Sequence, residues 1–341
     1  MKYFIFITIL TLASNLFLVF SANALTISPV RVEISGDPGQ TLHGEIELFN
    51  EEAETRTFFS STANFEARGE GGAPHFLPER TGFATWISVQ EKITLKPQER
   101  INVPYSITTP PEAEPGGHFA AIFWGTSPPH PDEAGQVAIG GKLGMLILLN
   151  VTGEVEEGGG ILDFKIEQEK IVTSLPVIFT YRFSNDGDAR IRPVGEIKIR
   201  NILGFTSAII DANKAEGNVL PGSVRKFRAL WHSAGQRMGD LTKMEELALM
   251  TKVAEEVEKE KGFFEIAGAQ WRNFAFGLYT AELNLAFGNG GEKTWHRFFV
   301  FPWQLLIIII VMLTIFGFFA VVGIKKYNRW IIKQAQAGKF Q

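Results

Sequence analysis

Short runs in which apolar and polar residues alternate fill the chain from residue 25 onward, and Gly, Pro, Asn and Asp separate them. Alternation at every second position is typical of strands with one buried face, and these separators are typical of turns. In the first part of the chain we interpret as strands the runs 26–34, 42–48, 57–65, 86–89, 93–95, 100–107, 119–124 and 143–151. Short strands at this spacing predict an immunoglobulin-like β-sandwich over residues 25–153.

The pattern stops at the glycine-rich stretch 154–160, which we interpret as a linker because successive glycines hold an extended core poorly. It resumes in the runs 161–166, 177–183, 191–199, 206–210, 224–231, 277–287 and 294–301. A second sandwich is therefore predicted over residues 161–300. The predicted fold class is all-β, with two tandem immunoglobulin-like β-sandwiches.

Residues 240–261 break the β pattern. Their apolar side chains recur at helical spacing, at Met244, Leu247, Met250, Val253, Ala254 and Val257. This spacing predicts an inserted helix with Asp240 as its cap and Gly262 as its stop. In an immunoglobulin-like strand order the insertion lies between strands E and F, at the end of the domain nearest the membrane. Its seven acidic and four basic residues disfavour anionic lipid, so we expect the apolar stripe to pack on the sandwich or on a partner protein.

The first residues are typical of an export signal. Lys2 precedes an uncharged, mostly apolar run, and Ala22-Asn23-Ala24 matches the small-residue pattern at which a signal peptidase cleaves. We interpret residues 1–24 as a signal peptide; a retained signal anchor is the alternative. The rest of the chain is expected to be exported.

A second apolar run, residues 305–324, contains no charged residue, and fifteen of its twenty residues are Leu, Ile, Val or Phe. On an insertion scale these sum to about −7 kcal/mol in favour of the membrane. We predict a transmembrane helix over 303–324, with a buried core helix as the alternative. Residues 325–341 carry five basic residues and no acid, which predicts a cytoplasmic tail and an N-terminus outside.

Composition narrows the possible functions. Between the two apolar ends the chain has 27 Lys and Arg against 37 Asp and Glu, a net charge of about −10, so a nucleic-acid partner is not expected. The absence of cysteine excludes thiol chemistry, cysteine zinc sites and iron–sulfur clusters. The sequence contains no phosphate loop, dinucleotide fingerprint or nucleophile elbow. We therefore predict neither an enzyme nor a cofactor.

The stretch Gly116-Gly117-His118 is the first candidate for local chemistry. His118 has His130 nearby in sequence, but a metal site needs three or four converging ligands, so no metal site is predicted. Asp186-Gly-Asp188 is interpreted as a turn, because two acids fall far short of a calcium loop. The glycines instead indicate a strand entrance, followed by a central strand that is apolar on both faces. His118 and Trp124, near the ends of that strand, are the candidate ligand contacts, and a sugar is the ligand considered for Trp124.

Three stretches carry a family resemblance: LTISPVRVEISGDPGQTLHGEIELFN (25–50), ITLKPQERINVPYSITTP (93–110) and PGGHFAAIFWG (115–125). With the export signal, they resemble the first domain of bacterial WxL-interacting cell-surface proteins. Related immunoglobulin-like domains, including pilus-chaperone-like ones, share these motifs more loosely. The resemblance implies a peptidoglycan-binding first sandwich, a second sandwich that contacts host or partner proteins, one transmembrane helix and a basic cytoplasmic tail. The insertion at 240–261 departs from that pattern.

These observations predict a membrane-anchored binding or scaffold protein of the bacterial cell surface. It attaches non-covalently to the cell wall or to another surface protein. Two alternatives stay open. One is a chaperone-like assembly subunit that donates a sheet edge to a client strand. The other is an accessory subunit of a membrane complex, with the inserted helix as its docking element.

Overall fold

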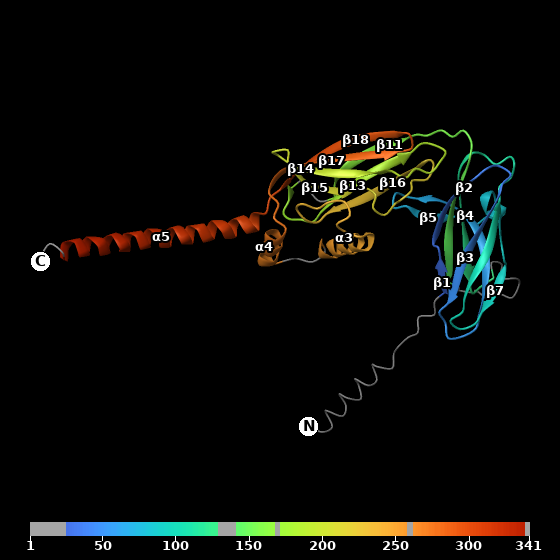
Figure 1. Ribbon diagram of the computed structural model, residues 1–341, viewed down its shortest axis with the longest axis horizontal. Coiled ribbons are helices and arrows are strands. Elements are labelled where there is room, and N and C mark those ends of the chain that lie inside the picture. Colours follow the sequence, from blue (N-terminus) through green and yellow to red (C-terminus); the bar gives the residue numbers. More distant parts are fainter. Residues whose placement is uncertain (1–24, 129–140, 168–170, 258–261, 338–341) are drawn as a thin grey trace, which may run out of the picture. The chain divides into compact units, whose positions relative to one another are not determined.

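The computed structural model describes residues 25–128, 141–167, 171–257 and 262–337 (Figure 1). The predicted signal peptide and His130 lie outside these residues. The described chain is mostly β, with a helical segment late in the β-rich part and one long apolar helix near the C-terminus, as predicted. It divides into two compact units, and the main division falls between Glu156 and Glu157, inside the stretch 154–160. The short segment Gly69–Gly72 belongs to unit 2, and Gly187–Arg190 belongs to unit 1.

Unit 1 consists of two sheets. The first has the order β1-β3-β8-β6 and comprises β1 (Leu25–Ser28), β3 (Thr41–Asn50), β8 (Arg100–Thr108) and β6 (Ile87–Val89). The second has the order β2-β10-β9-β4-β5 and comprises β2 (Arg31–Gly36), β10 (Lys142–Val151), β9 (Gly116–Gly125), β4 (Arg56–Arg68) and β5 (Ala73–Phe76), with β7 (Lys92–Leu95) also paired to β4. A short helix, α2 (Phe83–Trp86), precedes β6. Only the β2–β10 pair is parallel among the pairs described in this unit.

The core of unit 1 lies between the sheets and is built from alternate residues of the long strands. The first sheet contributes Ile46 and Leu48 of β3 and Val103 and Ile107 of β8. The second sheet contributes Ile122, Trp124, Met145, Ile147 and Leu149. The period of two in the sequence therefore identified the buried face of β3 and β8 correctly. In β4 it indicated the wrong face, because the run through Thr57, Phe59 and Ser61 lies outward and the core residue is Phe58.

Unit 2 also consists of two sheets. One has the order β11-β13-β16 and comprises β11 (Gly159–Ile166), β13 (Val177–Asn185) and β16 (Ser223–Trp231). The other has the order β12-β18-β17-β14-β15 and comprises β12 (Ile171–Val172), β18 (Gly290–Val300), β17 (Gly277–Phe287), β14 (Val194–Asn201) and β15 (Thr206–Asp211). β14 begins three residues later than the predicted run at 191, because Pro193 has no N–H to give to a sheet.

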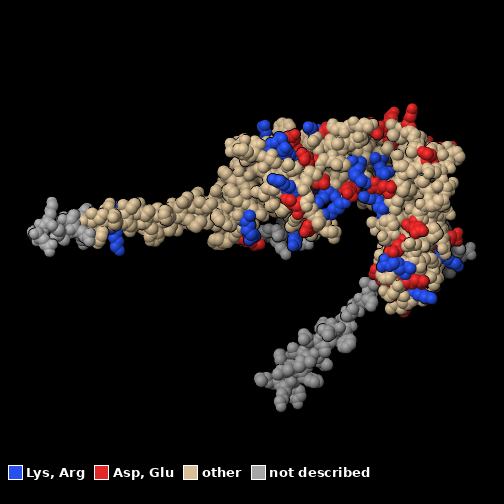
Figure 2. All heavy atoms as spheres, viewed as in Figure 1, with Lys and Arg blue, Asp and Glu red and all other residues tan. Residues whose placement is uncertain are grey.

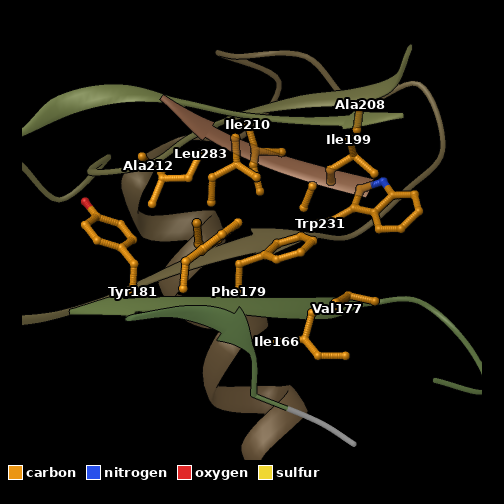
Figure 3. Packing of buried hydrophobic residues seen from close by; sticks show 14 of the residues in the cluster. Ile166, Val177, Phe179, Tyr181, Ile199, Ala208, Ile210, Ala212, Trp231 and Leu283 are labelled. Atoms are coloured by element: carbon orange, nitrogen blue, oxygen red, sulfur yellow. The ribbon is translucent and has the colours of Figure 1, made fainter. Parts of the chain in front are cut away.

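Aromatic side chains fill the space between the two sheets of unit 2. In Figure 3, Phe179 and Tyr181 of β13 point toward Ile210 and Leu283 of the opposite sheet. The rings of Phe179 and Phe298 lie 5.6 Å apart in an edge-to-face arrangement that aromatic pairs favour.

The helical segment of unit 2 lies between β16 and β17, where an insertion was predicted. It contains α3 (Lys243–Val257) and a second helix, α4 (Phe263–Arg272), which the sequence pattern did not predict. The predicted cap is wrong: Thr242, not Asp240, caps α3. The Thr242 hydroxyl accepts a hydrogen bond from the Glu245 N–H at 3.2 Å, and the Glu245 carboxylate accepts one from the Thr242 N–H at 2.7 Å. This reciprocal pair is a capping box, and it places the helix start after Thr242.

The long helix α5 (Trp303–Ala337) extends beyond the predicted transmembrane segment. It continues through Lys325, Lys326 and Arg329, so the start of the predicted basic tail is helical. Residues 325–337 contain neither Gly nor Pro, so nothing in this part of the tail stops a helix that has already begun.

Candidate functional site

The two residues singled out from the sequence have different surroundings. His118 lies at the start of β9, where its Nε2 is 2.8 Å from the Glu114 carbonyl oxygen and its ring centroid is 4.9 Å from that of Trp86. Trp124 is 0% exposed and belongs to the core of unit 1. The strand entrance positions His118 beside an aromatic ring, while the same strand carries Trp124 inward. The two side chains therefore do not form one surface site.

The glycines before His118 serve the local backbone. Gly116 has a φ of 115°, which L side chains rarely adopt, and a Cβ at this position would lie 2.7 Å from the Asp188 carbonyl oxygen. That same oxygen accepts a hydrogen bond from the Gly117 N–H at 2.9 Å. Across the described residues, no three His, Asp or Glu side chains converge on a point where a metal ion could bind.

The β2–β10 side of the second sheet in unit 1 has an incomplete edge. β2 pairs with β10 only from Leu146 to Val151. The Leu146 N–H donates to the Val30 carbonyl at 2.9 Å, so even-numbered residues of β10 direct their backbone groups to this side. Residues 142–145 pair with β9 on one side and with no described strand on the other. An unpaired edge of this kind is a template for another strand.

An aromatic surface lies on the outer face of the same sheet. Phe65, Phe76, Phe119 and Phe123 come from β4, β5 and β9, and their rings are linked by centroid distances of 5.9 Å for Phe65–Phe119 and 4.8 Å for Phe76–Phe123. Alternation along the strands directs these rings away from Trp124 and the core. Phe76 is exposed, Phe119 and Phe123 are half-buried, and Phe65 is buried beneath them. A partly exposed apolar patch on a sheet face can serve as an interaction surface.

On the free edge of β16 in unit 2, by contrast, the backbone of Leu230 is hydrogen-bonded to side chains that follow the strand. The Leu230 N–H donates to Glu246 Oε1 of α3 at 3.2 Å, and the Leu230 carbonyl accepts from Gln236 Nε2 at 3.0 Å. Glu246 is buried, whereas Met244 and Leu247 of the predicted apolar stripe are 76% and 61% exposed. Met244 and Leu247 therefore do not pack on the sandwich, because α3 turns the Glu246 carboxylate toward the sheet edge, and the alternative that the stripe packs on a partner protein stays a prediction.

Helix α5 is the one described helix that is long and apolar enough to cross a membrane, and almost none of the apolar segment is buried. Figure 2 shows it free of charged side chains over most of its length, with basic residues only toward its C-terminal end. At its other end the Leu305 N–H donates to Gln270 Oε1 of α4 at 2.9 Å, and Gln270 Nε2 donates to Gln304 Oε1 at 2.6 Å. Helix α4 is therefore fastened to the first turn of α5.

No protein-family model and no curated protein matches the chain. Among solved structures, the class 5 fimbrial chaperone CfaA is 12% identical, with a TM-score of 0.35 over 80% of this chain and 98% of that chain. The chaperone–tip adhesion subunit complex CsuC–CsuE of Acinetobacter baumannii Csu pili is 10% identical, with a TM-score of 0.31 over 60% and 89%. The PapD-like domain 7 of human CEP192 is 14% identical, with a TM-score of 0.27 over 40% and 94%. Scores this low establish neither a shared function nor a family.

Proposed function

We propose that the chain is a single-pass membrane protein whose β-rich part, two tandem immunoglobulin-like β-sandwiches, binds a partner protein outside the cytoplasm. The partner contributes a strand that pairs with the free part of β10 and extends the sheet of unit 1. This is the action of a chaperone-like assembly subunit that offers a sheet edge to its client.

The observation that carries this proposal is the unpaired segment 142–145 of β10. Lys142 and Gly144 direct their backbone groups outward, so they offer a donor and an acceptor each to an added strand. The side chain of Leu143, 45% exposed, lies on the same segment. Phe123 of the aromatic surface lies against Gly144 of β10 and is the ring placed to contact a side chain of the bound strand. Hydrogen bonds between the main chains would give affinity, and side-chain contacts would give specificity.

The edge can be tested in the full-length protein by replacing one backbone donor. Lys142→Pro removes the outward N–H at the first residue of β10, a position that tolerates proline, and Lys142→Ala removes the same side chain but keeps the N–H. A photo-cross-linking residue at Leu143 reports the bound partner, and one at Leu162 of β11 serves as an exposed control.

We expect a single cross-linked species from position 143, absent from position 162. It should be lost in the Lys142→Pro background and kept with Lys142→Ala. Equal cross-linking in both backgrounds would show that the partner does not pair with the β10 backbone.

A second candidate function, attachment to cell-wall carbohydrate, is favoured by the half-buried ring pair of Trp86 and His118. An aromatic ring beside a polar ring offers an apolar face and a hydrogen-bonding group to one ligand. Sedimentation of the detergent-solubilised chain with purified cell wall tests it. Trp86→Ala should then lower the bound fraction, while Phe76→Ala, in the same unit but away from these rings, should not.

A further inference from the structure

Large apolar side chains are exposed at one end of unit 2. Contact between so much apolar surface and water is unfavourable. The side chains come from three separate segments: the β14–β15 turn, helix α4 and the connection from α4 to β17. We call them the membrane-end cluster, which consists of Leu203, Phe205, Phe264, Trp271, Phe274 and Phe276. Each is at least half exposed, and Leu203 and Phe264 reach 75% and 80%. Scattered apolar residues need no explanation, but a concentration of this size does.

Sheet register places these segments at the same end as the start of α5. Asn201, the last residue of β14, pairs with Tyr279 near the start of β17. Gly277 pairs with Val300 at the end of β18, three residues before α5 begins. The rings of Phe276 and Phe301 lie 6.3 Å apart across this junction. The β14–β15 turn, the start of β17 and the root of α5 are therefore neighbours.

The β14–β15 turn is held in a fixed shape. The Asn201 side-chain oxygen accepts hydrogen bonds from the N–H groups of Leu203 at 3.1 Å and Phe205 at 3.0 Å. The Asn201 N–H in turn donates to the Phe205 carbonyl at 3.0 Å. The turn therefore presents Leu203 and Phe205 outward in an ordered conformation, not as a collapsed loop.

Helix α4 presents its own apolar stripe. Phe264, Gly268 and Trp271 are four and three residues apart and share one face, while Glu265 and Arg272 fall on the neighbouring one. Gln270 is buried and fixes α4 to Gln304 and Leu305, the point at which the apolar run of α5 begins. The ring of Phe263 also lies 5.8 Å from that of Trp303.

We propose that the membrane-end cluster is seated in the interfacial layer of the same bilayer that α5 spans. This inference rests on the proposed membrane anchoring and adds that unit 2 is itself a peripheral membrane-contacting domain. The occupant is lipid because the exposed surface is continuous with the transmembrane helix at the height where its apolar run starts. Trp is enriched at that height, and helices that lie in the interface carry Trp, Phe and Leu on their apolar face. An amphipathic helix in this layer buries its apolar face about 5–10 Å into the headgroup and acyl boundary.

The natural chain has no cysteine, so single cysteines can be introduced for spin labels without a background. Labels at Leu203→Cys and Phe264→Cys report the cluster in the full chain reconstituted into phosphatidylcholine vesicles. Ile315→Cys in the middle of α5 reports the bilayer interior. Asn289→Cys is the aqueous control, because it lies in the exposed turn at the opposite end of the β17–β18 hairpin. Power saturation with oxygen and with a water-soluble nickel chelate gives the depth of each label.

We expect the oxygen-to-nickel accessibility ratio at 203 and 264 to lie well above that at 289 and below that at 315. A ratio at 203 and 264 equal to that at 289, with 315 still in lipid, would overturn this inference alone. A water-exposed label at 315 would instead overturn the membrane anchoring itself. Shielding of 203 and 264 from both reagents in cell-derived membranes, with water exposure in pure lipid, would also overturn the inference, because it would assign the cluster to a protein partner.

Discussion

Glu246 shows how burial of a single carboxyl group links stability to pH. Burial raises the pKa of Glu246, and the ammonium of Lys214, 3.6 Å from its Oε2, opposes the rise without cancelling it. The folded protein therefore holds this proton to a higher pH than the unfolded chain does. The resulting contribution to stability is complete below the unfolded pKa of about 4.3 and is lost as pH rises through the folded pKa.

Glu246→Gln removes this titration while its amide oxygen can still accept the Leu230 N–H. We expect the free energy of unfolding of the variant, relative to the natural chain, to rise between pH 4 and pH 7. Glu245→Gln is the matched control with the opposite sign, because hydrogen bonds from Thr242 lower the pKa of Glu245. Denaturant titrations of both variants at several pH values would measure the two slopes. Parallel slopes would refute the assignment.

Gln270 is a buried polar residue that caps a helix other than its own. The Leu305 N–H is one of the donors left unpaired at the start of α5, and Gln270 Oε1 accepts from it. Gln270→Ala leaves that N–H and the Gln304 side chain without this partner, which should cost about 1–3 kcal/mol. Thermal unfolding of Gln270→Ala, Gln304→Ala and the double variant measures it. A double variant equal to the sum of the single ones would show that the two amides are not coupled.

At the scale of elements, α3 meets the free edge of β16 through the hydrogen bond from the Leu230 N–H to Glu246. Its start depends on the Thr242–Glu245 capping box, so Thr242→Ala should weaken α3 by about 1 kcal/mol. Hydrogen exchange should then accelerate in the first turns of α3 and at Leu230, whose N–H is paired to Glu246. Thr242→Ser keeps the hydroxyl and should leave exchange unchanged. Unchanged exchange in Thr242→Ala would show that packing, not the cap, sets the helix start.

The sequence predicted most elements but not every contact that they make. Alternating runs identified the long strands of both units, because burial of one face imposes the period of two. The short strands β5 and β12 offer too few residues for a period to be read. Helix α4 was missed because the two residues that it buries, Ala267 and Gln270, are small or polar, while its large apolar residues Phe264 and Trp271 are exposed and do not mark a core-facing stripe.

The candidate site shows the same limit at the level of single side chains. Trp124 was considered a ligand contact because it lies near a strand end, yet the sheet carries that ring inward. The unpaired segment of β10 could not be foreseen either, since it depends on how far β2 extends along its neighbour. Strand pairing is a long-range property, and the local pattern of one strand does not contain it.

At the scale of the whole molecule, charge and hydropathy change together along the chain. The β-rich part carries an excess of acids, α5 is uncharged over its apolar run, and Lys325, Lys326 and Arg329 follow at its far end. Basic residues beside a transmembrane helix are retained in the cytoplasm. We therefore expect an epitope tag placed after Gln341 to be cytoplasmic.

That orientation can be measured in sealed vesicles whose outer surface corresponds to the outside of the cell. External protease should digest the β-rich part and leave the tag intact, and detergent should then make the tag cleavable, which confirms that the protease is active. Replacing Lys325, Lys326 and Arg329 by Gln removes the charge signal but preserves the apolar run, so a fraction of the chains should invert and expose the tag. Digestion of the tag in the natural chain without detergent would contradict the orientation, and with it the proposal that the β10 edge meets its partner outside the cytoplasm.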